Sequence, residues 1–553
     1  MTDMRQVVNK VSPRMIFWAG AVVIIFACFM AYIPAIKGGF VWDDNKYVTK
    51  NPLLSAPDGL FRIWFSTDSP SQYFPLVYTT FRAEYQLCGL NPTSYHVVNV
   101  AIHCINALLL WVILRRLSIP GAWLASAIFA LHPVHVESVA WITERKNTLM
   151  LLFSLLSILC WVKFVLDNQA GRKAILLYAC SLLFCALSLF SKATACMLPA
   201  ALVLILWLKN SPITVKRWLQ IVPYIAMAIG DGLLVMWWER HHQGTGYVNF
   251  GLSVTEKVLI AGKALWFYLW KLVWPVNLTF SYPRWNIDAT DVWQYAWPVS
   301  FAMVLSAGWL LRKRTGRGIP TAIIFFPAML FPMLGFFPLY TFIYTFVADH
   351  YQYMASIGPI AIAAGIAATV YRKSGEKVKF IIVSAAGVLL LTFGILTYQQ
   401  CHAYTDVKTL WADTLKKNPD SLLAHGSVGK MLFEEGKYIE AKSHLEQAIK
   451  VAPYLKTAMP AKYAIMHYDM AVDLQALGRL DDAVVYYRKS LAIREHFPLA
   501  HYQLAVILAE QGNVEQARLH FLRVLEITRE KGKNDKLDEA ICRELNLLEK
   551  KSN

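Results

Sequence analysis

Two adjacent carboxylates, Asp43 and Asp44, follow the first long apolar run of the chain. A carboxylate beside a second one can act as a general base whose pKa its neighbour tunes, and such a pair can also bind a metal ion. A loop end or a helix cap uses the same residue types. The residues themselves leave these interpretations open.

A second polar group lies between two later apolar runs, where His132, His135 and Glu137 are followed by Arg145 and Lys146. The first three residues suggest zinc, but helical zinc sites of this kind need the spacing HExxH, so metal binding is not favoured. Arg145 and Lys146 can bind an anionic headgroup or a phosphate. The alternative is that both cations only extend to the lipid surface.

Charged residues in two further connections complete the set. Lys192 is a lone cation in a short turn between apolar runs, and Asp349 and His350 precede another apolar run. Charges at the ends of membrane segments are costly, so they indicate function by default. We expect Asp349 to orient the His350 ring and to fix its tautomer.

The composition indicates which elements must position these residues. Hydrophobic residues make up 56% of the 553-residue chain, charged residues only 16%, and the mean hydropathy is +0.39. This is the composition of a polytopic membrane protein.

The net charge is +17, but Lys and Arg gather between the apolar runs as in cytoplasmic loops, so nucleic-acid binding is not expected. The nine cysteines form no CxxC pair.

The sequence contains twelve apolar runs. The first, Met15–Ile36, follows three basic residues and is predicted to be an uncleaved anchor with a cytoplasmic N-terminus. The others lie near 95–114, 119–139, 148–166, 174–190, 194–208, 218–238, 254–275, 290–311, 319–338, 353–371 and 380–398.

One of these runs is predicted not to cross the membrane. The basic connectors all become cytoplasmic only if one segment between 218 and 311 stays on one side. The segment 254–275 carries several charges and a stripe of Trp266, Trp270 and Trp274, which is typical of an interfacial helix. We therefore expect about eleven spans and an outer C-terminal part. The alternative is twelve spans and a cytoplasmic C-terminal part.

The tail from residue 401 to 553 is predicted to be a helical-repeat domain, whereas residues 1–400 form the membrane domain. Gly478 and Gly512 are 34 residues apart and separate helical patterns with tetratricopeptide spacing, and the middle copy contains eight extra residues around Leu455 to Lys462. A histidine occupies the same place in all three copies. We favour a packing role for these histidines over a metal or pH role. They are His425, His467 and His501.

The predicted topology places the polar groups on one face. All four groups lie on the outer side, together with a long loop, 37–94, whose many aromatic residues predict that it is ordered against the membrane. Carboxylates and cations at an outer membrane surface suit a lipid-linked anionic substrate that meets a water-borne acceptor.

Five segments together resemble the transmembrane and tetratricopeptide-repeat protein O-mannosyltransferases and their bacterial relatives, within the GT-C superfamily of glycosyltransferases. The resemblance covers nearly the whole chain and includes the repeat tail. The segments are 40–51 (FVWDDNKYVTKN), 89–103 (GLNPTSYHVVNVAIH), 132–146 (HPVHVESVAWITERK), 274–278 (WPVNL) and 347–353 (VADHYQY).

The resemblance implies an all-α GT-C-type membrane bundle with a repeat solenoid, and an enzyme that moves a sugar from a polyprenyl-phosphate donor with inversion. The acceptor would be a hydroxyl, expected to be a protein Ser or Thr, and the repeats would hold the acceptor or a partner. Asp43 or Asp44 would be the general base, and Arg145, Lys146, Lys192 and His350 would bind the donor phosphate. Further substrate-binding residues would be His132, His135, Glu137, Asn51, His96, Asp349, Tyr351 and Tyr353.

No cofactor is predicted, and a divalent cation stays open but is not favoured. The sequence departs from the family pattern at Asn147 and Ala193, where relatives often have an acid, at His350, where many have arginine, and at Phe74, where a polar residue is common. The short chain favours a prokaryotic inner membrane and a periplasmic repeat domain. The alternatives are a non-enzymatic scaffold for envelope assembly, and a polysaccharide ligase or flippase. The sequence names neither the sugar nor the acceptor.

Overall fold

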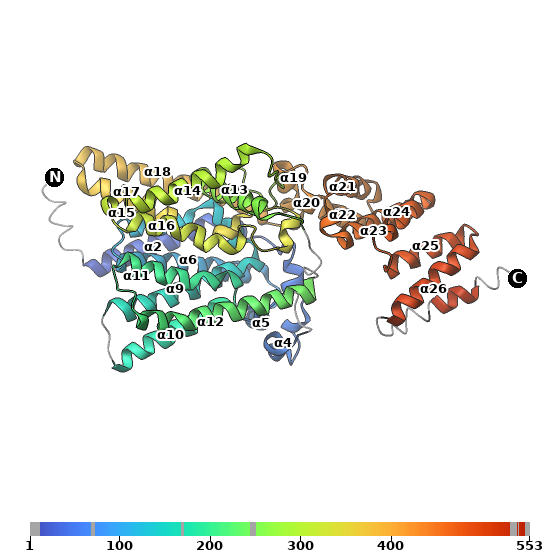
Figure 1. Cartoon of the computed structure of the whole chain (residues 1–553), viewed down its shortest axis with the longest axis horizontal. Coiled ribbons are helices and arrows are strands. Elements are labelled where there is room, and N and C mark those ends of the chain that lie inside the picture. Colours follow the sequence, from blue (N-terminus) through green and yellow to red (C-terminus); the bar gives the residue numbers. More distant parts are fainter. Residues whose placement is uncertain are drawn as a thin grey trace.

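The computed structural model describes residues 12–67, 72–167, 171–243, 250–530, 539 and 541–547. All regular structure in these residues is helical. The long apolar helices lie side by side along the longest axis of the molecule, and the repeats extend from one end of this bundle (Figure 1). The first turns of α2 lie at the opposite end. This arrangement agrees with the predicted all-α fold.

Each of the twelve predicted apolar runs forms a helix. The helices are α2 (Pro13–Ala31), α6 (Pro92–Arg116), α7 (Ala122–Leu131), α9 (Arg145–Leu166), α10 (Gly171–Leu189), α11 (Leu198–Leu208), α12 (Val215–Trp238), α13 (Val254–Val273), α14 (Ala296–Leu310), α16 (Gly318–Leu330), α17 (Ile357–Lys373) and α18 (Glu376–Cys401). Among the described residues, six helices are long and apolar enough to cross a membrane, and three shorter helices are apolar. The number of about eleven spans stays a prediction.

Local sequence signals explain where these helices begin. The Ser12 and Asn91 side chains accept hydrogen bonds from backbone N–H groups at the starts of α2 and α6, and a proline occupies the first position of both helices. Gly121 precedes α7 with a φ of 73°, and a Cβ at this position would lie 2.3 Å from the Ala364 carbonyl oxygen. Only glycine allows this close approach of α7 to α17.

Small polar residues hold α9 against α10. The Ser154 and Ser188 hydroxyls lie 2.8 Å apart, and the Ser157 hydroxyl donates to the Ser181 carbonyl oxygen at 2.7 Å. Such residues let two apolar helices approach closely and bond across the interface. Because α9 begins at Arg145 and α10 ends just before Lys192, this packing brings the two predicted cationic segments together.

Helix α13 starts with a capping box of Ser253 and Glu256. Like α14 and α17, it falls outside the nine apolar helices. Trp270 and Trp274 are exposed, whereas Trp266 donates its indole N–H to the Ser300 hydroxyl at 3.0 Å. The interfacial position predicted for this helix stays a prediction.

The repeat domain consists of paired helices. They are α19 (Val407–Lys417), α20 (Leu422–Glu434), α21 (Tyr438–Val451), α22 (Leu455–Ala458), α23 (Pro460–Ala476), α24 (Leu480–Ile493), α25 (Pro498–Glu510) and α26 (Val514–Glu530). Gly436, Gly478 and Gly512 have φ values of 76°, 74° and 79°, so each glycine ends a helix in the left-handed conformation that the turn requires. The extra residues of the middle copy form α22 and the start of α23.

The remaining short helices lie between the long ones. They are α3 (Ile33–Ile36), α4 (Gly59–Phe65), α5 (Pro75–Cys88), α8 (Val136–Ala140) and α15 (Arg312–Thr315). Helices α4 and α5 belong to the loop 37–94 and pack around Tyr78 and Phe81, which are almost completely buried. The loop is therefore ordered against the bundle, as its aromatic content predicts.

Candidate active site

Glu144 is the centre of a buried ionic cluster at the start of α9. Its Oε1 lies 3.1 Å from the Lys146 Nζ, and its Oε2 lies 3.0 Å from the Lys192 Nζ. The Asn147 side chain donates to Oε2 at 2.7 Å. Only 2% of Glu144 is exposed. The structure thus brings together Lys146 and Lys192, two of the four residues predicted to bind a phosphate.

Aromatic rings surround Lys146 on the side that faces the outer loop. Its Nζ lies 5.0 Å from the centroid of the Tyr47 ring, 5.4 Å from that of Phe74 and 5.8 Å from that of Trp141. These cation–π contacts keep the ammonium group in place next to Glu144. Phe74, one of the positions that depart from the expected family pattern, therefore helps to hold the Lys146 ammonium group.

The two predicted catalytic carboxylates have different environments. Asp44 is fully buried, and its Oδ2 accepts from the Val41 N–H at 2.8 Å. Its Oδ1 accepts from the Thr143 N–H at 2.8 Å and from the Thr143 hydroxyl at 2.5 Å. Burial raises the pKa of Asp44 to about 7, although these donors act to lower it. Asp44 therefore ties the outer loop to the segment that precedes α9.

Asp43 is only half-buried, and among the described residues no hydrogen-bond donor reaches its side chain. Burial raises its pKa, and the positive charges of Lys146 and Lys46 act in the opposite direction. Trp42, the residue before it, has a φ of 41°, which is rare for a side chain of this size. Asp43 therefore lies within the electrostatic field of Lys146 and Glu144, whereas Asp44 bonds to Val41 and Thr143.

His350 pairs with Glu137. The His350 Nδ1 lies 3.0 Å from the Glu137 Oε1, and the His350 N–H donates to Oε2 at 2.9 Å. Asp349 instead accepts from the Tyr282 hydroxyl at 3.0 Å. The expectation that Asp349 orients His350 is therefore wrong, because the Glu137 carboxylate occupies that position. Asn147 connects the two parts of the site, since its amide also donates to the His350 carbonyl oxygen at 2.9 Å.

Arg145 does not belong to this surface. It is fully buried, its Nε donates to the Asn99 Oδ1 at 2.7 Å, and its Nη2 donates to the Tyr95 carbonyl oxygen at 2.8 Å. Its Nη1 pairs with Glu84. All three nitrogens are engaged with the protein, so the structure argues against the predicted phosphate-binding role of Arg145 and supports a role in anchoring α5 and α6 to α9.

Most of the other predicted substrate-binding residues hold helices together. His132 Nε2 lies 2.9 Å from the Leu272 carbonyl oxygen, His135 Nε2 lies 3.0 Å from the Ser356 hydroxyl, and His96 Nε2 lies 3.2 Å from the Gly39 carbonyl oxygen. The Tyr353 hydroxyl lies 2.6 Å from the His103 Nδ1, and Asn51 caps the turn at Leu53. These contacts give the residues structural roles, contrary to the expectation.

A pocket adjoins the ionic cluster. A small pocket contains Lys192, Asn147 and Tyr351, whose hydroxyl lies 2.6 Å from the Thr341 hydroxyl. Within the described residues, no group of three or more His, Cys, Asp or Glu side chains is arranged to hold a metal ion. Tyr351 and Tyr353, two members of the predicted substrate-binding set, thus both line this pocket with Lys192 and Asn147.

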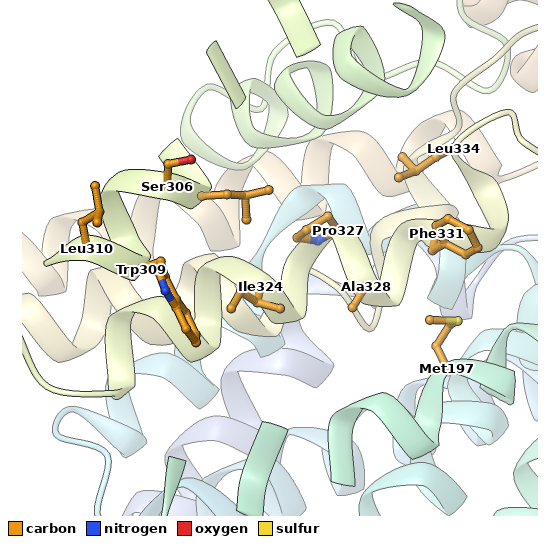
Figure 2. Close-up of a pocket in the computed structure, with 10 residues that line it drawn as sticks. Met197, Ser306, Trp309, Leu310, Ile324, Pro327, Ala328, Phe331 and Leu334 are labelled. Atoms are coloured by element: carbon orange, nitrogen blue, oxygen red, sulfur yellow. The ribbon is translucent and has the colours of Figure 1, made fainter. Parts of the chain in front are cut away.

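A larger apolar pocket of about 900 Å³ follows the membrane part of α14 and α16 (Figure 2). Trp309 and Leu310 line one end, and Phe331, Leu334 and Met197 line the other. The same segment of the chain lines both pockets, because Met329 and Met333 belong to the small one and Ala328 and Phe331 to the large one. The two pockets therefore border the same segment, residues 328–333.

The sequence analysis missed the central role of Glu144 and the bridging role of Asn147. Glu144 could have been found in the same way as Lys192. A carboxylate at the start of an apolar helix is as costly to bury as a cation there, so it also indicates function. Asn147 carries no such signal, and only the fold reveals that its amide meets both Glu144 and His350.

The fold and the site define a helical membrane protein with a buried ionic cluster beside an apolar pocket and a tetratricopeptide tail. Residues 68–238 match the family described as dolichyl-phosphate-mannose-protein mannosyltransferase, and residues 474–531 match the tetratricopeptide repeat. The chain is similar to the protein O-mannosyl-transferase F38B6.6 of Caenorhabditis elegans, with 25% identity over 78% of this chain and 62% of the relative.

Other relatives carry the same description. Tmtc3 of Drosophila melanogaster is 22% identical over 77% of this chain and 54% of its own length, and human TMTC4 is 34% identical over 28% and 24%. The chain thus spans less than two thirds of the length of these curated relatives. These matches confirm the resemblance to the transmembrane and tetratricopeptide-repeat protein O-mannosyltransferases. A crystal structure of ArnT from Cupriavidus metallidurans is 14% identical over 86% of this chain and 79% of that one, with a TM-score of 0.34.

Proposed function

We propose that this protein is a membrane glycosyltransferase that moves a sugar from a polyprenyl-phosphate donor to a hydroxyl of a protein acceptor on the outer face of the membrane. The relatives named as protein O-mannosyl-transferases support sugar transfer and a protein acceptor. The observation that carries the proposal is the position of Asp43, a half-buried carboxylate to which no described residue donates a hydrogen bond and on which the positive charge of the buried Lys146 acts.

The donor would occupy the larger pocket and extend to Lys192. The prenyl chain of the donor is apolar and would lie in the pocket along α14 and α16. Its phosphate would reach Lys192, which is 8% exposed and lines the small pocket, once the Lys192 side chain leaves Glu144. Lys192 would exchange Glu144 for the phosphate, while Lys146 and Asn147 keep the Glu144 carboxylate partnered. A lysine suits this exchange because its ammonium group is a compact charge on a flexible stem.

The reaction would be a single displacement. Asp43 takes the proton from the acceptor hydroxyl, the hydroxyl oxygen bonds to the anomeric carbon, and the bond from that carbon to the phosphate oxygen breaks, which inverts the configuration. Lys192 and Lys146 stabilise the charge on the departing polyprenyl phosphate. Glu137 and His350 lie at the same surface and would contact the sugar or the phosphate.

Separate Asp43→Asn and Asp44→Asn variants test the proposal with radiolabelled polyprenyl-phosphate sugars. General base catalysis contributes about 10²- to 10⁴-fold, so Asp43→Asn is expected to lower transfer by that factor without changing the melting temperature. Asp44→Asn is expected to lower the melting temperature, because an amide cannot accept from all three donors. Wild-type transfer by stable Asp43→Asn would contradict the role of Asp43. An absence of transfer from any donor would favour the alternative that the protein is a non-enzymatic scaffold for envelope assembly.

A further inference from the structure

The repeat domain meets the membrane domain at a junction close to Asp43. We define this junction as the loop 340–346 together with the segment 454–462, which contains the eight extra residues of the middle repeat. The Tyr454 hydroxyl donates to the Ile343 carbonyl oxygen at 2.5 Å. The Arg284 guanidinium lies 4.3 Å from the ring centroid of Phe346 and 4.5 Å from that of Tyr454, so one cation binds both sides.

The extra residues dock on the membrane domain. Leu455 of α22 is buried in the same apolar cluster as Ile343, and Tyr340 and Tyr344 pack against this cluster. The insertion therefore explains the break in the repeat spacing, because it forms a contact that a regular 34-residue copy lacks.

Two tyrosines of the junction belong to a loop that contacts the candidate site, because the hydroxyl of Thr341, which lies between them in sequence, is 2.6 Å from the hydroxyl of Tyr351 in the small pocket. The Tyr340 and Tyr344 hydroxyls lie 3.3 Å apart, and both side chains are half-buried. Burial raises the pKa of both hydroxyls, and the negative charge of Asp43 adds to this effect. Lys462 of the repeat domain lowers the pKa of Tyr340. The charges of Asp43 and Lys462 thus both act on Tyr340, and these two groups come from different domains.

The chemistry of this patch suits a peptide backbone. Two hydroxyls and an ammonium group can donate hydrogen bonds to carbonyl oxygens. Neither tyrosine contributes to the Glu144 cluster, so the donor site leaves both available. An acceptor whose hydroxyl reaches Asp43 must place the adjacent part of its chain beside them.

We propose that Tyr340, Tyr344 and Lys462 form a subsite at the junction that binds the polypeptide segment flanking the acceptor hydroxyl. This inference rests on the proposed function. Both domains would then recognise the part of the acceptor next to the reacting hydroxyl. The insertion of the middle repeat would position Lys462. A blocked single amino acid reaches Asp43 without using this subsite, whereas a longer peptide uses it.

Acceptors of different length test the subsite. We would measure transfer by Tyr344→Phe and Lys462→Ala to a blocked threonine and to a ten-residue peptide that contains one threonine. Loss of one hydrogen bond is expected to raise KM for the long peptide about fivefold and to leave kcat/KM for the blocked threonine unchanged. Lys456→Ala is the matched control, since Lys456 is an exposed lysine of the same insertion. An equal effect on both acceptors, or none on either, would overturn the subsite.

A second measurement does not depend on turnover. Benzoylphenylalanine in place of Tyr344 is expected to cross-link the ten-residue peptide on illumination, whereas the same replacement at Tyr502 in α25 is not. Cross-linking at position 502 alone would place the acceptor on the repeats and would overturn the inference. Failure of the proposed function has a different signature, because the wild-type protein would then transfer sugar to neither acceptor.

Discussion

Replacing Lys192 by methionine separates donor binding from stability. The side chain keeps nearly its length and loses its charge. In the wild type the Lys192 Nζ lies 3.0 Å from Glu144, but Glu144 also contacts Lys146 at 3.1 Å and Asn147 at 2.7 Å. The carboxylate therefore stays partnered in the variant. We expect a loss of stability well below the about 3–5 kcal/mol that an orphaned buried charge costs.

The effect on the donor is expected to be larger. A hydrogen bond to a charged group contributes about 1.5–3 kcal/mol, which corresponds to a Kd about 10- to 150-fold weaker for polyprenyl phosphate. High salt is expected to reduce this difference only slightly, because Lys192 is 8% exposed and therefore poorly screened.

Equilibrium binding of radiolabelled polyprenyl phosphate to the detergent-solubilised protein measures this difference. Lys50→Met is the matched control, because Lys50 is an exposed lysine of the outer loop. Its Kd and melting temperature are expected to equal those of the wild type. A Kd for Lys192→Met within threefold of the wild type would refute the phosphate site. A collapse of the melting temperature would instead show that Lys192 is mainly structural.

Three further results are expected. The rate of transfer should fall as the pH drops through the raised pKa of Asp43, above the usual value of about 3.9, and this acid limb should vanish in Asp43→Asn. Burial lowers the pKa of both His501 and His520, the latter to about 4, so protection of the α25 and α26 amides against hydrogen exchange, relative to the intrinsic rate at each pH, should fall as the pH drops from about 6.5 toward 4; unchanged protection would contradict the pairing. The exposed Cys88 and Cys542 should both react with an impermeant thiol reagent in intact cells. If Cys542 reacted only after lysis, the repeat domain would lie on the cytoplasmic side, contrary to the predicted topology.

The elements of the fold could be predicted because each depends on local patterns. The apolar runs and the 34-residue spacing identify helices without knowledge of their neighbours. The histidines of the repeats show the limit of this approach. His425 and His501 were expected to pack, yet each Nδ1 meets a second histidine Nδ1, at 2.9 Å and 2.8 Å, because the partner lies on the following helix. The partners, His444 and His520, have no sequence signal of their own.

The site was predictable only in part. Lys146 and Lys192 could be placed on one face from topology, and the structure brings them together. Arg145 and Lys146 are neighbours in sequence, but successive residues of a helix point about 100° apart, so one faces the cluster and the other faces Glu84. Which of the two faces the site depends on the rotation of α9 against α6 and α10. That rotation is set by packing between segments far apart in sequence.

The contacts of the repeat domain also bear on how the chain is made. Lys417 donates to the Leu278 carbonyl oxygen at 2.7 Å, Asn418 donates to the Ser281 carbonyl oxygen at 2.9 Å, and Tyr454 bonds to Ile343. In every pair the partner in the membrane domain leaves the ribosome first. The first nascent repeats therefore emerge after the membrane segments that they contact have been synthesised.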